Sequence, residues 1–383
     1  MRVTKIKLLN FRNYQRAEFS FSPGANIIVG KNAQGKTNLL EAIFTCAIGK
    51  SMRAARDSEV ILFGQENAKI ELEVEKKFGK TKIEIYFLKN KKAIKINGLP
   101  IRRTGELLGE LRCVFFSPDE LKLIKESPED RRRFMDISLS QISKVYFNIL
   151  NKYDKIIRSR NKLIKDFKDK NSVKKSNLST LNLEDFKRMI SVYDVQLSDC
   201  AAKISLSRNN LIVSLAPYAK RAREFLTDGA EELEIEYQTS FSVEAPVLNG
   251  NEIVEKFKEK YLALYEKSLE KDLALGYTSV GPHRDDIKVL INKIDVKSFC
   301  SQGQQRTAAL SLKLAELEII NKQTGEMPIL ILDDVLSELD EGRRTKLLKF
   351  CGSTQTFISS TDIPEKIKNS KIIRIRSGQE VRN

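Results

Sequence analysis

Apolar and polar residues near the start of the chain are arranged in a way that predicts a strand, a glycine-rich loop and a helix. Residues 26–29 read Asn-Ile-Ile-Val, an apolar and β-branched run typical of a buried strand. Beyond a polar stretch bounded by glycines, apolar residues recur at Leu39, Leu40, Ile43 and Ala47, which is the spacing of one helix face. Residues 1–25 predict a hairpin that leads into the strand, with its turn at residues 10–14.

The middle of the chain changes from an alternating to a helical pattern. Alternation over residues 66–100, with turns at 78–80 and 97–98, predicts an antiparallel patch, and residues 114–116 predict a short buried strand. Pro128 stands where a helix is expected to begin. From there to about residue 275 the pattern is mainly helical and rich in lysine, with residues 168–182 as an exposed loop. No heptad repeat is sustained across this region, so we expect a compact helical insertion rather than a long coiled-coil arm.

A second strand near the C-terminus ends in two carboxylates. Residues 327–332 are continuously apolar and lead into Asp333 and Asp334. Continuous apolarity predicts a strand covered on both faces, as in a parallel sheet, and such sheets bind ligands at the carboxyl ends of their strands. We therefore expect both carboxylates at the same sheet edge as the glycine-rich loop. The predicted fold class is α/β, with a head formed by residues 1–133 and 276–383 and a mainly helical second lobe formed by residues 134–275.

Composition adds a preference for polyanionic partners. The 383 residues include 67 Lys and Arg against 51 Asp and Glu, a formal net charge of +16. This favours nucleic acid, although solvated lysines give the same total. Five scattered cysteines without a C-x-x-C pair argue for reduced thiols in the cytoplasm and against a zinc site. No run approaches about 18 apolar residues, and the N-terminus lacks the apolar core of a signal peptide, so we expect no membrane span or leader.

The glycine-rich loop reads G-x-x-x-x-G-K-T, the phosphate-binding loop of nucleoside triphosphatases. Its glycines let backbone N–H groups surround a phosphate, and the helix that follows adds a partial positive charge. Lys36 is expected to reach the β/γ-phosphates, and the Thr37 hydroxyl to bind Mg²⁺, so the sequence predicts ATP or GTP binding. Two basic residues are further nucleotide-binding candidates: Arg12 in the hairpin turn and Arg53 after the helix. The loop candidates are Gly30, Lys31, Asn32, Ala33, Gln34, Gly35, Lys36 and Thr37.

The two carboxylates at residues 333 and 334 have separate predicted roles. Asp333 is the candidate Mg²⁺ partner beside Thr37. Asp334 is expected to orient or deprotonate the attacking water, because hydrolysis of the γ-phosphate depends mostly on positioning and charge neutralisation. A strand end capped by two aspartates is the structural alternative, and the complete phosphate loop favours the catalytic interpretation.

Two later clusters resemble parts of the ATP-binding-cassette superfamily. Ser301-Gln302-Gly303-Gln304-Gln305 resembles its signature motif, and Ser337-Glu338-Leu339-Asp340 resembles its D-loop. The resemblance implies that the signature helix binds the γ-phosphate held by the other subunit, through Ser301, Gly303 and Gln304. It also implies a catalytic role for Asp340 and a head-to-tail dimer with two shared ATP sites. A helix N-terminus with a serine hydroxyl and free N–H groups suits that contact.

The order of these parts resembles the RecF family of recombination-repair proteins. The resemblance covers essentially the whole chain and implies an ABC-type head, an ATP-dependent homodimer on DNA and slow, DNA-stimulated ATP hydrolysis with Mg²⁺. It also implies a preference for gapped or junction DNA and help in loading recombinase filaments through a RecR-type partner. Six motifs carry the resemblance: the phosphate loop, the signature motif, residues 332–340, Leu9-Asn10-Phe11-Arg12-Asn13-Tyr14, Phe116-Ser117-Pro118-Asp119 and Gly281-Pro282-His283-Arg284-Asp285-Asp286.

Other interpretations stay open at this point. The runner-up is the ATPase subunit of a membrane transporter, which usually carries a histidine after the D-loop where this chain has Ser359, Ser360 and Thr361. A chromosome-organising clamp would need longer arms, and a GTPase would not need the signature motif. His283 is either a loop hydrogen-bonding residue or a catalytic or metal group. The run at residues 131–133 is either a DNA contact or a solvated helix start.

Overall fold

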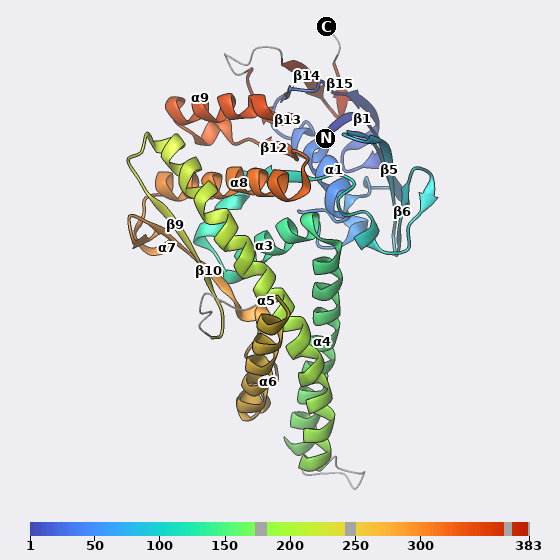
Figure 1. The fold of residues 1–383 in the computed structure, drawn as a ribbon. Helices are drawn as coiled ribbons and strands as arrows, with labels where there is room; N and C mark the ends of the chain where they lie inside the picture. Colours follow the sequence, from blue (N-terminus) through green and yellow to red (C-terminus); the bar gives the residue numbers. More distant parts are fainter. Residues whose placement is uncertain (173–181, 242–249, 364–369, 382–383) are drawn as a thin grey trace. The chain divides into compact units, whose positions relative to one another are not determined.

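The computed structural model describes residues 1–172, 182–241, 250–363 and 370–381 (Figure 1). The chain divides into two compact units, with one division between α2 and α3 and the other three inside α5, β9 and β10. These bounds differ from the predicted lobes, chiefly because residues 214–234 group with the first unit; the predicted lobe bounds stay a prediction. Unit 1 comprises Met1–Glu126, Ser214–Glu234 and Val289–Asn383, and unit 2 comprises Ser127–Val213 and Ile235–Lys288.

A six-stranded sheet forms the centre of unit 1, in the order β15-β14-β3-β13-β12-β8. Every neighbouring pair from β14 to β8 is parallel, and β15 pairs with β14 antiparallel. All five residues of β12 are buried, as its continuous apolar sequence predicts. The strands are β3 (Ala25–Val29), β8 (Cys113–Phe116), β12 (Ile329–Asp333), β13 (Thr356–Ser360), β14 (Lys371–Arg376) and β15 (Gln379–Glu380).

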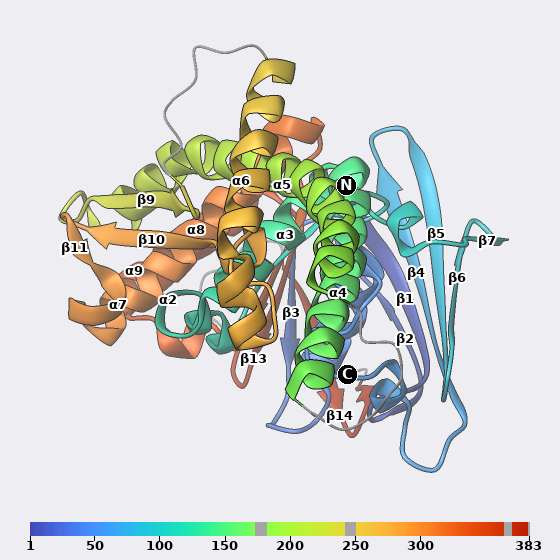
Figure 2. The same cartoon turned by 90° about the horizontal axis from the view of Figure 1, so that it is seen from below.

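An antiparallel sheet in the order β2-β1-β4-β5-β6-β7 forms the second layer of unit 1 (Figure 2). Helix α1 (Lys36–Ile48) packs against β8, β12 and β13 of the first sheet and against β4 and β5 of the second. Ten of its thirteen residues are buried, which is expected for a helix covered on both sides. The strands are β1 (Arg2–Phe11), β2 (Tyr14–Ser20), β4 (Asn67–Lys76), β5 (Gly79–Leu88), β6 (Lys92–Ile96) and β7 (Leu99–Pro100).

Unit 1 also contains the helix that follows the signature serine. Helix α8 (Gln302–Thr324) packs against β8 and α2 (Lys122–Lys125), and α9 (Glu341–Phe350) follows the D-loop. A three-stranded sheet has the order β11-β10-β9. The divisions between the units fall within two of its strands, β9 (Leu233–Gln238) and β10 (Asp286–Ile291), whereas β11 (Ile294–Asp295) belongs to unit 1. The remaining elements of unit 1 are α7 (Val296–Phe299) and the short 3₁₀ helices Asp57–Val60, Thr104–Glu106, Pro118–Leu121, Leu336–Glu338 and Cys351–Ser353. Together these layers confirm the predicted α/β fold with a mixed sheet and an antiparallel patch.

Unit 2 is built mainly from helices. They are α3 (Pro128–Ile142), α4 (Lys144–Ser172), the first part of α5 (Leu183–Thr227) and α6 (Gly250–Leu275), with a 3₁₀ turn at Pro282–Arg284. The loop predicted over residues 168–182 starts too early, because α4 continues to Ser172; residues 173–181 lie outside the described residues. Within α4 the buried residues Tyr146, Tyr153, Ile157, Arg160 and Ile164 fall at heptad spacing. Helix α5 has a longer run of buried residues at the same spacing, and its members are Ile190, Asp194, Leu197, Ala201, Ile204, Arg208 and Leu211. Both runs include buried charged residues, so neither is a continuous apolar seam.

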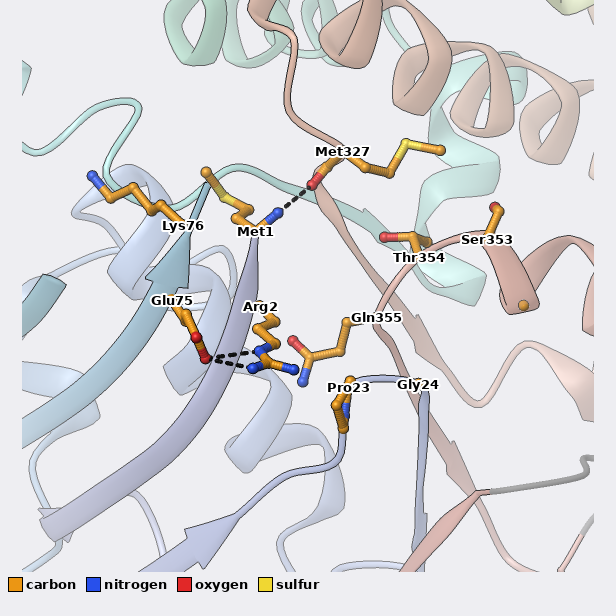
Figure 3. Close-up of a pocket in the computed structure, with 11 residues that line it drawn as sticks. Met1, Arg2, Pro23, Gly24, Glu75, Lys76, Met327, Ser353, Thr354 and Gln355 are labelled. Atoms are coloured by element: carbon orange, nitrogen blue, oxygen red, sulfur yellow. Dashed lines mark hydrogen bonds and ion pairs between the residues drawn. The ribbon is translucent and has the colours of Figure 1, made fainter. Parts of the chain in front are cut away.

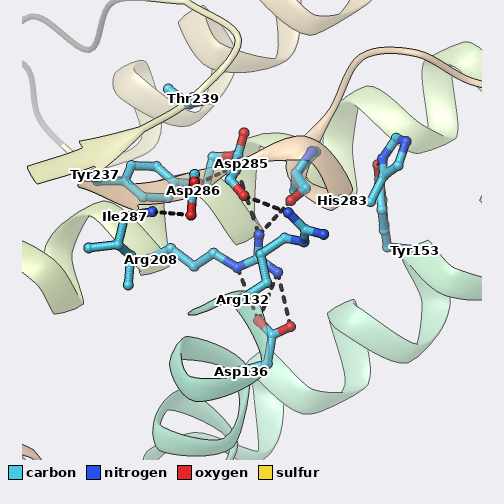
Figure 4. Close-up of polar contacts among 12 residues, drawn as sticks. Arg132, Asp136, Tyr153, Arg208, Tyr237, Thr239, His283, Asp285, Asp286 and Ile287 are labelled. Carbon is cyan, nitrogen blue, oxygen red and sulfur yellow. Dashed lines mark hydrogen bonds and ion pairs between the residues drawn. The ribbon is translucent and has the colours of Figure 1, made fainter. Parts of the chain in front are cut away.

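Buried ion pairs join the helices of unit 2. Arg160 of α4 is fully buried and contacts Asp194 of α5 at 2.6 Å and Asp272 of α6 at 2.7 Å. Arg208 of α5 contacts Asp136 of α3 at 2.8 Å (Figure 4). A buried charge is tolerated only when it is paired, so these contacts fix which helices are neighbours.

Candidate nucleotide-binding site

The phosphate loop connects β3 to α1 and requires glycine at both ends. A Cβ at Gly30 would lie 2.5 Å from the carbonyl oxygen of Ile375, where no real contact is possible. Gly35 has a φ of 115° and precedes the first residue of α1, and a Cβ there would lie 2.9 Å from the Tyr14 hydroxyl. The sequence spacing G-x-x-x-x-G therefore follows from the close approach of neighbouring segments as well as from phosphate binding.

Lys36 lies at the start of α1 with its side chain turned along the loop. Its Nζ donates to the carbonyl oxygens of Gly30 and Lys31, the latter at 3.2 Å. Only 8% of the residue is exposed. The loop therefore concentrates an ammonium group beside the backbone N–H groups that open α1, an arrangement suited to a polyphosphate.

Two hairpin turns of the same chain contact the back of the loop. From the first, the buried Tyr14 hydroxyl donates to the Gly35 carbonyl at 2.8 Å, and Asn13 Nδ2 donates to the Gln34 carbonyl at 3.1 Å. From the second, the Gly378 N–H donates to the same Gln34 carbonyl at 3.1 Å. Residues 377–378 had no place in the sequence prediction: their Ser-Gly pair signals a turn but does not reveal what the turn contacts.

Thr37 and Asp333 lie together at the sheet edge, as the strand order predicts. Thr37 Oγ1 donates to Asp333 Oδ1 at 3.0 Å, and Ser359 of the intervening strand β13 donates to the same oxygen at 2.6 Å. Burial raises the pKa of the Asp333 carboxyl, while the two hydroxyl hydrogen bonds and the charge of Arg53 act in the opposite direction. A carboxylate and a hydroxyl are hard oxygen donors, and Mg²⁺ at triphosphate sites needs only one or two such protein ligands. These residues fit Mg²⁺.

Asp334 occupies a different environment one residue further on. It is exposed and has a φ of 54°, a left-handed conformation that aspartate tolerates better than most residues. Its backbone N–H donates to Ser359 Oγ at 2.9 Å, and its carboxylate accepts from Ser337 Oγ at 3.3 Å. The turn thus directs one carboxylate into the sheet edge and leaves the next open to solvent.

The two additional candidates, Arg12 and Arg53, differ in their contacts. Arg12 contacts the buried Glu41 of α1 through two nitrogens, at 3.0 and 2.7 Å, and donates to the Glu59 carbonyl at 2.9 Å. Its charge is therefore balanced within the chain. Arg53 lines, together with Arg12 and Asn38, an open pocket of about 500 Å³ beside the loop, with the exposed Phe63 among the lining residues.

The signature serine begins α8. The Ser301 hydroxyl accepts from the Gln304 N–H at 3.3 Å, and Gln304 Oε1 accepts from the Ser301 N–H at 3.0 Å, which is a complete capping box. Behind it, the fully buried Arg223 donates to the Gln304 carbonyl at 2.9 Å and pairs with Glu231, which also accepts from Gln304 Nε2 at 2.7 Å. The sequence pattern contains no signal for this support, because a buried arginine cannot be told from a solvated one in a helical pattern.

The D-loop is linked to the same helix. Arg306 of α8 pairs with Glu338. Asp340 caps the N-terminus of α9, and its carboxylate accepts from the Arg343 N–H at 2.9 Å. The candidate Gly303 lies one residue into α8 and is partly buried. Ser301 and Asp340 are both helix caps in this structure, and their catalytic roles stay predictions.

The comparisons with known proteins cover the whole chain. The family model described as the RecF/RecN/SMC N terminal domain matches residues 2–382. The DNA replication and repair protein RecF of Ruminiclostridium cellulolyticum is 42% identical over 94% of this chain and 93% of its own length. That of Staphylococcus carnosus is 39% identical over the full length of both.

The chain belongs to the RecF family. A solved structure described as the recombination mediator protein RecF-ATP of the RecFOR pathway has a TM-score of 0.86 at 38% identity, covering 99% of this chain and 97% of that one. An Smc head domain from Pyrococcus furiosus, with a TM-score of 0.52 at 15% identity over 99% of this chain and 94% of that one, shares the fold only. The predicted RecF resemblance is confirmed. Within the described residues, no helix is both long and apolar enough to cross a membrane.

In this RecF-family chain, His283 lies in a hydrogen-bond network. Its Nδ1 contacts the hydroxyl of Tyr153, which lies beside it in Figure 4, at 2.6 Å. Its Nε2 contacts the Thr278 carbonyl at 3.0 Å. Burial lowers the pKa of the imidazole to about 4. Across the described residues no group of three or more His, Cys, Asp or Glu side chains is arranged to hold a metal ion, so these contacts favour the hydrogen-bonding interpretation over the metal interpretation.

The run at residues 131–133 is not a simple solvated helix start. Arg131 is buried and pairs with Asp286, and Arg132 donates to the Asp285 carbonyl at 2.8 Å. Burial lowers the pKa of the Arg132 guanidinium. Two of the three arginines therefore stabilise the turn that carries the RecF-family motif at residues 281–286.

A second pocket, of about 400 Å³, lies at the amino ends of the parallel strands (Figure 3). Its polar groups contact one another: Arg2 pairs with Glu75 at 2.7 Å, and Gln355 accepts from the Val3 N–H at 2.6 Å. Ligands of open α/β sheets bind at the opposite ends of the strands. This pocket is therefore separate from the nucleotide site.

Proposed function

We propose that this chain is an ATP-dependent DNA-binding protein of recombinational repair and replication maintenance, acting as a head-to-tail homodimer. The observation that carries the proposal is the contrast between a phosphate loop completed by its own chain and a signature serine that is exposed. A second copy would supply its Ser301 to the nucleotide held by the first. Two shared sites per dimer follow from that symmetry.

ATP with Mg²⁺ is the proposed ligand of the phosphate loop. Lys36 and the N–H groups at the start of α1 would bind the phosphates, and Thr37 with Asp333 would hold Mg²⁺, which supplies charge neutralisation at the γ-phosphate. The RecF structure with bound ATP, at 38% identity over nearly the whole chain, supports ATP over other nucleotides. Arg53, which lines the pocket beside the loop, is a further proposed nucleotide contact.

Hydrolysis is proposed to be slow and to act as a switch. Asp334 is exposed next to Asp333 and would position the attacking water. Ser359 lies in the region where transporter ATPases usually carry a histidine. Its hydroxyl donates to Asp333, the proposed Mg²⁺ ligand, so the proton points at that carboxylate rather than at a γ-phosphate. Gly303, Gln304 and Asp340 of one subunit are proposed to complete the site of the other.

DNA is the proposed polyanionic partner. The net charge of +16 favours backbone contacts, which are independent of sequence. The relatives are named DNA replication and repair proteins, and one is described as a recombination mediator. We extend this to gapped or junction DNA as the preferred substrate, weak stimulation of ATP hydrolysis by DNA, a RecR-type protein as the partner in recombinase loading, and a cytoplasmic location.

The test is binding to a gapped duplex, with and without ATP, over a range of salt. We expect ATP to double the molecular mass and to tighten DNA binding, because a dimer presents twice the charge of a monomer. The logarithm of the binding constant should fall linearly with the logarithm of salt concentration, by about 0.9 for each phosphate neutralised. Equal affinity without nucleotide, or a flat response to salt, would contradict the proposal.

A further inference from the structure

The outward face of α4 carries a line of basic side chains. Its inward face is apolar apart from Arg160 and packs against the rest of unit 2, so the solvent face is defined by the helix itself. Along that face the exposed basic residues recur every three or four positions and therefore lie on one side of the helix. They are Lys152, Lys155, Arg158, Lys162 and Lys165, and together they form the α4 basic face.

The charges of the α4 basic face are not neutralised locally. In the part of the chain that the structure describes, none of Lys152, Lys155, Lys162 and Lys165 takes part in an ion pair. The charge of Arg158 lowers the pKa of the partly buried Asp154 carboxyl, but burial of that carboxyl has the larger effect and raises its pKa. Lysines held to acidic neighbours would have to give up those contacts to bind an anion, and these lysines make none with the residues that the structure describes.

Helix α6 of the same unit provides a contrast. The sequence of α4 contains nine Lys and Arg against three Asp, whereas that of α6 contains five Lys against six Asp and Glu. Both helices have a buried face and an exposed face. The mixed charges of α6 show that an exposed helix face in this unit can be solvated without an excess of positive charge. The excess of Lys and Arg over Asp on α4 therefore calls for a separate explanation.

We propose that the α4 basic face binds the sugar-phosphate backbone of duplex DNA. From Lys152 to Lys165 the helix rises about 20 Å, which is more than half of one turn of the duplex. The exposed neighbours Asn148, Asn151 and Ser159 add neutral hydrogen-bond donors of the kinds that contact phosphate oxygens. Point charges on a helix surface read no base edges, so the contact is independent of sequence.

The composition of this face fits DNA better than two other polyanionic partners. Protein interfaces are depleted in lysine and enriched in aromatic residues, and the exposed positions from 151 to 165 contain no aromatic residue. Binding to an anionic membrane surface needs an exposed apolar face beside the charges, and the apolar face of α4 is buried. An acidic protein and an anionic vesicle are therefore alternatives that the experiment below separates.

The proposal rests on the proposed DNA-binding function and assigns it a surface. The test replaces Lys155, Lys162 and Lys165 together by glutamine. The matched control replaces Lys256, Lys267 and Lys271 of α6, which are also exposed and without ion pairs among the described residues. We expect the α4 variant to lower the slope of the salt dependence by about 2.7, from three contacts of about 0.9 each, and to weaken binding about tenfold or more. The α6 variant should bind DNA like the parent, and both should bind ATP and unfold like the parent.

Each outcome separates the surface from the function. If the parent itself does not bind DNA, the proposed function fails whatever the variants do. If the parent binds and the α4 variant binds equally well, or the α6 variant loses as much, the α4 basic face is not the contact. If the α4 variant keeps DNA binding but loses binding to vesicles of anionic phospholipid or to a polyglutamate peptide, the face serves a membrane or an acidic protein and the proposal is overturned.

Discussion

The phosphate loop and the signature serine are treated very differently by the chain that contains them. The loop is contacted from behind by two hairpin turns, through Tyr14, Asn13 and Gly378. The serine is exposed, and among the described residues its hydroxyl makes its hydrogen bond within its own capping box. Support reaches the first turn of α8 only from behind, through Arg223 and Glu231. The phosphate loop is supported by contacts within its own chain, whereas the signature serine is supported from behind and exposed to solvent.

This contrast indicates whether the phosphate loop and the signature serine are expected to act within one chain or between two. A loop with several internal hydrogen bonds is pre-organised for a ligand that the same chain binds. A supported helix N-terminus with an exposed cap is pre-organised for a ligand brought by another molecule. Four substitutions test this difference between the loop and the serine.

Replacing Lys36 by alanine should have the largest effect. The change removes the ammonium group that donates to the Gly30 and Lys31 carbonyls of the loop, and charge-assisted hydrogen bonds contribute about 1.5–3 kcal/mol each. We expect ATP affinity, measured by equilibrium binding of a fluorescent ATP analogue, to fall about a hundredfold or more. Lys31→Ala is the control, because Lys31 is exposed and its backbone remains in place. Similar losses in both variants would mean that the loop needs positive charge in general rather than Lys36.

Replacing Ser301 by arginine tests the other half of the contrast. A bulky cation at a helix N-terminus opposes the partial positive charge there and crowds any close interface. We expect normal ATP binding by the monomer, no ATP-induced dimer by light scattering, and loss of hydrolysis and of tight DNA binding. Ser301→Ala is the control: it removes the cap, at a cost of about 1 kcal/mol, without adding the obstacle. A fully active, monomeric Ser301→Arg protein would rule out shared sites.

Mixing the two inactive proteins sharpens the same test. In a mixed dimer one interface pairs the intact loop of the Ser301→Arg subunit with the intact signature of the Lys36→Ala subunit. Partial recovery of ATP hydrolysis, up to the fraction of such dimers, is expected. No recovery at any ratio, with mixed dimers present by mass, would place both functions in one subunit.

The sequence predicted the parts whose signals are local. The phosphate loop has a fixed spacing, and the continuous apolar run before Asp333 identifies a covered parallel strand, so their meeting at one sheet edge followed from topology. Contacts between distant residues had no such signal: the hydrogen bond from Ser377 to Gln34 joins residues 343 positions apart. Buried arginines were missed for a related reason. Arg160, Arg208 and Arg223 cannot be told from solvated helix charges until their acidic partners are placed beside them, and the sequence leaves Arg131 open between a DNA contact and a solvated helix start.

Replacing Asp334 by asparagine should affect turnover without affecting binding. Asparagine tolerates the φ of 54° at this position, so the turn after β12 is kept, and Asp333 remains beside Thr37. We expect ATP affinity within a few-fold of the parent and hydrolysis slowed about a hundredfold, in the range found when a positioned acid–base group is removed. An ATP-bound dimer should accumulate. Unchanged single-turnover hydrolysis would show that Asp334 does not position the water.

The smallest expected effect concerns the internal support of the phosphate loop. The Tyr14 hydroxyl is buried and donates to the Gly35 carbonyl at 2.8 Å, and that carbonyl also accepts from the Leu39 N–H at 3.0 Å. Tyr14→Phe keeps the ring, which packs edge-to-face with Phe19 at 5.9 Å, and removes only the first of these two hydrogen bonds. Because the carbonyl keeps one partner, the cost should be near the lower end for a buried hydrogen bond, about 1 kcal/mol.

Loss of the Tyr14 hydrogen bond should lower ATP affinity more than it lowers the stability of the fold. Gly35 caps α1 with a left-handed φ, so a looser carbonyl there lets the first N–H groups of the helix point away from the phosphates. We expect ATP affinity to fall about fivefold, the equivalent of about 1 kcal/mol, with the melting temperature lowered by only a few degrees. Tyr86→Phe is the matched control, since its hydroxyl donates to Glu84 at 3.1 Å on the antiparallel sheet rather than to a loop carbonyl. If Tyr14→Phe binds ATP as tightly as Tyr86→Phe, the hairpin stabilises the fold without setting the geometry of the loop.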